Sequence, residues 1–127
     1  MGAIAPLAAA IAAYAFGAVW YMVLAKPWMA AAGMTEEQVQ NGSKLPFLIS
    51  AIAVILVAGM MRHIFSMAGI EGFGKGALTG IGLGLFIATP WIVTNYSYSD
   101  RPRNLMLIDG GYATFGCTIM GAVLGIF

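Results

Sequence analysis

The stretch GFGKGALTGIGLGLFIATPWIVTNY, residues 72–96, decides the fold class of this chain. It contains one charged residue, Lys75, and most of its other residues are apolar or small. A membrane-spanning helix needs about 20 mostly apolar residues, so the stretch predicts a transmembrane helix over residues 75–96. Its glycines recur at intervals of four, at Gly72, Gly76, Gly80 and Gly84. Residues four apart share one helix face, so a neighbouring backbone can approach this face closely.

Three further apolar stretches lie on either side of this one and predict spans over residues 3–25, 45–61 and 105–127. The chain is 61% hydrophobic and 9% charged, whereas soluble domains carry roughly 25% charged residues. The 127 residues have room for four spans and little else. We therefore expect an all-α integral membrane protein, a four-transmembrane-helix bundle that forms a single domain over residues 1–127.

The first connection is the longest polar segment of the chain. Trp20 and Tyr21, followed by Lys26, are typical of a membrane–water boundary, and Pro27 is expected to stop the first helix. Beyond it, the sequence from Thr35 to Gln38 fits a capping box, and Asn41-Gly42 supplies a helix stop. We expect a short interfacial helix here, lying on the membrane surface between spans one and two.

The cations predict an orientation in the membrane. The loops after spans one and three carry four of them, Lys26, Lys44, Arg101 and Arg103, whereas the opposite side carries Arg62 and Lys75. The positive-inside rule therefore places these two loops in the cytoplasm and both termini on the outer, periplasmic side. Arg62-His63 is expected to terminate the second span. Because the cations form no cluster, nucleic acid is not expected as a partner.

The single cysteine and single histidine exclude two classes of membrane protein. One thiol, Cys117, cannot supply the paired cysteines of a thiol oxidoreductase. One imidazole, His63, cannot supply multi-histidine haem ligation. No nucleophile–base pair or phosphate loop is visible either, so we expect no catalytic residue, no metal site and no cofactor.

Small residues also recur at intervals of four in the first and fourth spans, at Ala5, Ala9, Ala13 and Gly17, and at Ala113, Cys117, Gly121 and Gly125. Two interpretations fit such faces. They allow tight helix packing inside one bundle, or they form the contact with another subunit. Gly72, Gly76, Gly80, Gly84, Cys117, Gly121 and Gly125 are the candidate helix-packing or subunit contacts.

Asp109 is the one acid inside a predicted span. Ionisable residues within a membrane are costly and are functional candidates by default. Asp109 lies close enough to the boundary to pair with Arg101 or Arg103, so a structural ion pair and a ligand or proton site are both open. Asn95, Tyr112, Arg101, Trp20 and Tyr21 are the other ligand or proton candidates. Either a boundary pocket or an ordinary aromatic belt is formed by Trp20, Tyr21, Trp91, Thr94, Asn95, Tyr96 and Tyr112.

Two blocks of sequence resemble a known family. One runs from Gly17 through Trp20-Tyr21, Lys26 and Trp28-Met29 to Gly33-Met34-Thr35-Glu36-Glu37. The other contains Asn95, Arg101-Pro102, Leu107-Ile108, Gly111-Tyr112 and Met120-Gly121. The chain resembles the small bacterial four-span proteins catalogued as domain of unknown function 1761, over nearly its whole length. The resemblance implies a four-helix fold in a bacterial inner membrane and no particular reaction.

The leading functional hypothesis is a non-enzymatic membrane protein that acts by assembly, as a homo-oligomer or as an accessory subunit of a larger membrane complex. Membrane lipid is the other expected partner. The alternative is an oligomeric small-molecule or ion transporter or channel that uses Asp109, with Asn95 and Tyr112 at its site. A third hypothesis is an interfacial enzyme that acts on lipid or quinone near Arg101.

Overall fold

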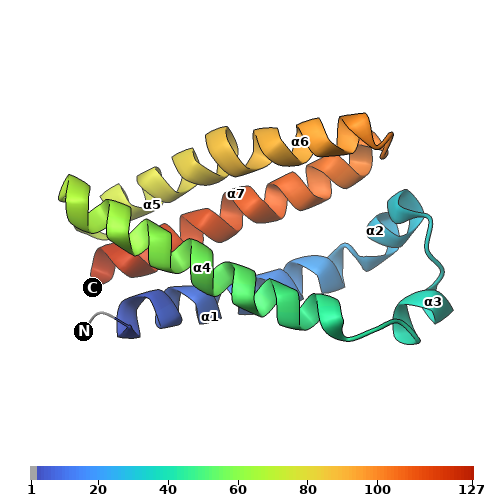
Figure 1. Ribbon diagram of the computed structural model, residues 1–127, viewed down its shortest axis with the longest axis horizontal. Helices are drawn as coiled ribbons and strands as arrows, with labels where there is room; N and C mark the ends of the chain where they lie inside the picture. The colour runs from blue at the N-terminus through green and yellow to red at the C-terminus, as the bar shows by residue number, and fades with distance from the viewer. Residues whose placement is uncertain (1–2) are drawn as a thin grey trace.

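The computed structural model describes residues 3–127 and shows a bundle of long helices (Figure 1). Residues 3–127 contain four helices long and apolar enough to cross a membrane, so the all-α, four-span prediction is confirmed. The elements are α1 (Ile4–Val23), α2 (Ala25–Ala32), α3 (Glu36–Gln40), α4 (Leu45–Ala68), α5 (Phe73–Leu83), the π-helical turn η1 (Gly84–Ala88), α6 (Thr89–Tyr98) and α7 (Arg103–Ile126). The third span consists of α5, η1 and α6.

The fourth span, α7, is the centre of the bundle. Half of the residues in its most apolar stretch are buried, against 28% in α1 and 17% in both α4 and the third span. It packs against α1 on one side and against α5, η1 and α6 on the other (Figure 1). The remaining span, α4, packs mainly on α1. Small residues along α7 make this position possible, because they let neighbours approach it from more than one direction.

The glycine stripe of the third span lies against α7 of the same chain. A Cβ atom added to Gly76 would overlap the carbonyl oxygen of Gly121, and one added to Gly80 would overlap that of Cys117. At the end of the interface, the Gly72 N–H donates a hydrogen bond to the Gly125 carbonyl at 2.8 Å. The two helices are therefore in backbone contact, with no side chain between them. This face is occupied within one chain.

The second helix is longer than predicted. Its sequence led us to expect an end at residue 61, before Arg62-His63, but α4 continues to Ala68. A charged residue at a membrane boundary ends the apolar span without ending the helix, since its backbone can still hydrogen-bond. The helix ends at Gly69, whose left-handed conformation (φ 68°) caps the last turn.

The first connection also differs from the prediction. Pro27 does not stop the first helix, because α1 ends at Val23 and a new helix, α2, begins at Ala25. Pro27 lies in the first turn of α2, where a missing N–H leaves no helical hydrogen bond unmade. Farther on, the predicted capping box is confirmed: Thr35 caps α3 and exchanges hydrogen bonds with Gln38.

The third span contains a π-helical turn that the sequence analysis did not predict. Pro90 lacks an N–H group, and its ring would clash with the carbonyl four residues earlier. The helix widens at η1 just before this residue. The Thr89 hydroxyl donates to the Gly84 carbonyl at 2.7 Å and lies 3.0 Å from the Thr114 hydroxyl of α7. The irregular turn is thus joined to the central helix by side-chain hydrogen bonds.

Candidate functional site

The Asp109 carboxylate joins three spans through two tyrosines. The Tyr21 hydroxyl, near the end of α1, donates to Oδ1 at 2.6 Å, and the Tyr96 hydroxyl of α6 donates to Oδ2 at 2.5 Å. All three side chains are partly buried. Both distances lie at the short end of the range for O–H···O hydrogen bonds. We call this arrangement the tyrosine bridge.

The hairpin between the third and fourth spans brings Tyr96 and Asp109 together. Tyr96 lies two residues before the end of α6 and Asp109 six residues after the start of α7. Both residues therefore lie within about two turns of the hairpin connection, at the same end of the bundle. Asp100 adopts a left-handed conformation in this turn (φ 57°), and the Arg101 N–H donates to the Tyr96 carbonyl at 2.8 Å. From the sequence, Tyr96 was expected at this boundary with Thr94 and Asn95, but it was not among the ligand or proton candidates.

Trp20 and Tyr112 surround the bridge with aromatic rings. The Trp20 indole N–H donates to the Ile108 carbonyl at 2.9 Å. The Tyr112 ring packs edge-on against Tyr21, with ring centroids 5.5 Å apart. A Cβ on Gly111 would lie 2.8 Å from the Trp20 ring. Glycine in α7 thus provides the space that the indole occupies.

Arg101 reaches the bridge indirectly. Its guanidinium lies over the Tyr96 ring, 5.8 Å from the ring centroid, as a cation–π contact. We expected Asp109 to be free to pair with Arg101 or Arg103. Within residues 3–127, however, the side-chain hydrogen bonds to its carboxylate come from the two tyrosines. A hydroxyl can donate from inside the helix packing, whereas a guanidinium favours the water at the boundary.

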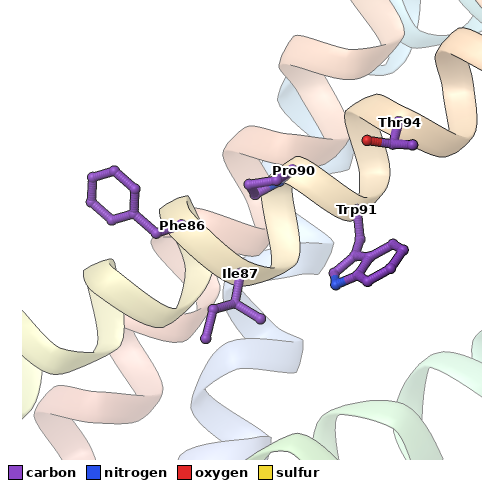
Figure 2. Close-up of a pocket in the computed structure, with 5 residues that line it drawn as sticks. All are labelled: Phe86, Ile87, Pro90, Trp91 and Thr94. Carbon is purple, nitrogen blue, oxygen red and sulfur yellow. The ribbon is translucent and has the colours of Figure 1, made fainter.

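Two of the predicted residues lie elsewhere. Asn95 is exposed, and within residues 3–127 its side chain makes no hydrogen bond. Trp91 is 67% exposed and projects outward from α6, where it lines a shallow groove with Phe86, Ile87, Pro90 and Thr94 (Figure 2). The candidate residues therefore divide into two places: the tyrosine bridge inside the bundle and an outward face on the third span.

The chemistry available at the bridge is that of a hydrogen-bonded tie. Both carboxylate oxygens accept a tyrosine hydroxyl, and each tyrosine belongs to a different span. Residues 3–127 hold no cluster of three His, Cys, Asp or Glu side chains that would suit a metal ion.

Fold and site together define a four-span membrane protein whose central helix is tied to two others by a partly buried acid. The family model described as protein of unknown function, DUF1761, matches residues 4–125, and the chain belongs to this family. No curated protein and no solved structure matches the chain. The family resemblance predicted from the two sequence blocks is thereby confirmed.

Proposed function

We propose that the chain is a non-enzymatic membrane protein that acts by assembly, as a homo-oligomer or as an accessory subunit of a larger membrane complex. The contact surface is an outward face of α6 formed by Trp91, Thr94 and Asn95, which we call the assembly face. The proposed setting is a bacterial inner membrane with both termini periplasmic. The cation-rich end that carries Lys26, Lys44, Arg101 and Arg103 supports this orientation.

The observation that carries the proposal is the pair of polar side chains on this face. Thr94 and Asn95 are exposed, and within residues 3–127 neither side chain has a hydrogen-bond partner. Polar side chains on the outer surface of a span gain by bonding to another helix. An asparagine amide carries both donors and an acceptor, so two copies of the same face can satisfy each other. A second copy of this chain is therefore the preferred partner.

The state of Asp109 favours assembly over transport. A proton or substrate site needs an acid that can exchange partners, whereas both oxygens of Asp109 are held by tyrosines of neighbouring spans. The glycine stripe of the third span is not available for a subunit contact, because α7 of the same chain already packs against it. A subunit contact therefore requires an outer surface of the bundle, and on the third span this surface carries the polar pair Thr94 and Asn95.

Disulfide trapping in native membranes tests the proposal. In a Cys117→Ala background, Thr94→Cys and Trp91→Cys are expected to give a cross-linked dimer upon oxidation. Leu56→Cys is the matched control, because Leu56 is 68% exposed on α4, against 67% for Trp91 on α6. Equal cross-linking at all three positions would indicate random collision. A single adduct with a different protein would identify the accessory-subunit form instead.

The alternative function, an oligomeric transporter or channel, depends on Asp109 itself. Its support is that a partly buried acid lies within a span. The deciding measurement is flux in proteoliposomes that carry wild-type or Asp109→Asn protein. Flux above that of empty liposomes, lost in the variant, would favour transport over assembly. An effect of Asp109→Asn on stability alone is the result that the tyrosine bridge predicts.

A further inference from the structure

A second groove lies between the third span and α7, on a different side of α6 from the assembly face. Its volume is about 560 Å³, within the range of roughly 300–1,000 Å³ that is typical of ligand pockets. Leu85, Thr89 and Val93 form one wall, and Arg103, Leu107 and Phe115 belong to the other. None of these residues lines the groove at Trp91. We call it the interspan groove.

The length of the interspan groove matches one leaflet of a bilayer. Its α7 wall extends from Arg103 to Phe115, twelve residues along a helix. At 1.5 Å per residue this is about 18 Å, and half of the ~30 Å hydrocarbon core of a membrane is ~15 Å. The groove therefore begins at the boundary and reaches the middle of the membrane, as a single acyl chain does.

The walls of the groove are suited to a hydrocarbon chain. The hydroxyls of Thr89 and Thr114 are the polar side-chain groups in its deeper part. Thr89 donates to the Gly84 carbonyl at 2.7 Å, and Thr114 donates to the Gly110 carbonyl at 2.8 Å. Since these donors are bonded within the protein, the groove presents mainly apolar surface to its occupant.

The mouth of the groove is positively charged. Arg103 is exposed at the start of α7, and within residues 3–127 its side chain has no ion pair or hydrogen bond. No side chain caps the N-terminus of α7, and its first turn contains no acid. The free N–H groups of a helix N-terminus favour an anion. A cation and a helix terminus thus converge where a lipid headgroup would lie.

We propose that the interspan groove binds one anionic phospholipid. One acyl chain lies between the third span and α7, and the headgroup phosphate bonds to the Arg103 guanidinium. The inference is independent of assembly, because the groove and the assembly face share no residue. The charge at the mouth and the apolar depth of one leaflet together select an anionic lipid over a free phosphate or a neutral hydrophobic molecule.

Native mass spectrometry of the full chain tests the site. The detergent-solubilised protein is mixed with equal amounts of phosphatidylglycerol and phosphatidylcholine that have identical acyl chains. We expect wild type to retain one phosphatidylglycerol in preference to phosphatidylcholine. Arg103→Gln should lower this preference about fivefold, the factor that corresponds to one basic residue near a membrane surface. Lys26→Gln removes an exposed cation at the same end of the bundle, outside the groove, and should leave the preference unchanged.

A second variant tests the groove separately from the charge. Leu107→Trp fills the groove and should reduce retention of both lipids, whereas Leu56→Trp, at an equally exposed position on α4, should not. Equal retention of both lipids by wild type overturns the proposal, as does an Arg103→Gln variant that behaves like Lys26→Gln. Loss of a dimer in Leu107→Trp with lipid retention unchanged would show that a second chain occupies the groove.

Discussion

The two ends of α7 are held by different physical means. Toward its C-terminus, Gly121 and Gly125 meet the glycines of α5 in backbone contact. Toward its N-terminus, Asp109 is held by the hydroxyls of Tyr21 and Tyr96. One end depends on the absence of side chains, and the other on particular polar ones. In a membrane, where water does not drive helices together, close packing and hydrogen bonding are the two available means.

The difference has a consequence for substitution. The glycine interface has no side chain that can move aside, so even one methyl group must push the backbones apart. The bridge end contains rings and a carboxylate with room to adjust, so its loss leaves polar groups unsatisfied without forcing the helices apart. We therefore expect stability to depend on side-chain size at the glycine interface. At the tyrosine bridge we expect it to depend on hydrogen-bonding capacity.

The largest effect is expected for Gly76→Ala. The new Cβ would overlap the Gly121 carbonyl oxygen, and overpacking of this kind costs about 3 kcal/mol. The free energy of unfolding in mixed micelles should fall accordingly. Gly82→Ala is the matched control on the same helix, because nothing lies within 4 Å of its added Cβ. It should be neutral or stabilise the protein by up to about 1 kcal/mol. Similar losses in both variants would contradict the backbone-contact interface.

An intermediate effect is expected for Asp109→Ala at the other end. The change leaves the Tyr21 and Tyr96 hydroxyls without their acceptor, at a cost of about 2 kcal/mol in the free energy of unfolding. Glu37→Ala, on exposed α3, should change it by less than about 0.5 kcal/mol.

A double-mutant cycle shows whether the Asp109 effect comes from the bridge. Tyr21→Phe alone should cost about 1 kcal/mol and should cost almost nothing in the Asp109→Ala background. Tyr98→Phe, at a position 91% exposed, is the control for loss of a hydroxyl. Additive losses for Tyr21 and Asp109 would mean that the two residues act independently.

The smallest effect on global stability is expected for Thr35→Ala. Thr35 caps α3, which lies outside both contact regions of α7. The change removes the Thr35 hydroxyl that accepts from the Gln38 N–H, whereas the Thr35 N–H that donates to the Gln38 side chain remains. Moreover, α3 is exposed along its whole length. The free energy of unfolding should stay within about 0.5 kcal/mol, while amide exchange over residues 36–40 becomes faster. A clear loss of global stability would show that α3 contributes to the bundle.

Local signals in the sequence were enough to predict most of the helices. Long apolar stretches predicted the spans, and the pattern from Thr35 to Gln38 predicted a capped helix. The errors lie at helix ends. Arg62 was interpreted as the end of a helix, although charge ends only the apolar part, and the helix continues to Ala68. Pro27 was interpreted as a stop, although its position in a first turn is permitted.

The candidate site was predicted less completely. Asp109 stood out because an acid within a span is rare, and Tyr21, Trp20 and Tyr112 were predicted near it. The partner of Asp109 was not predicted, because an arginine at the boundary and a tyrosine in the next helix both lie within reach along the chain. Asn95 was placed with Asp109, but its side chain is exposed and makes no hydrogen bond within residues 3–127.

The sequence by itself determined that this chain forms four membrane-spanning helices and belongs to its family, because apolar length and local motifs are properties of consecutive residues. Only the tertiary structure decided that α7 lies at the centre, that the glycine stripe is occupied within one chain, and that Asp109 binds two tyrosines. A helix face of small residues spaced four apart can pack against any neighbouring helix that also presents small side chains. Which partner it meets depends on how all four helices share the available surface, and no stretch of consecutive residues contains that information.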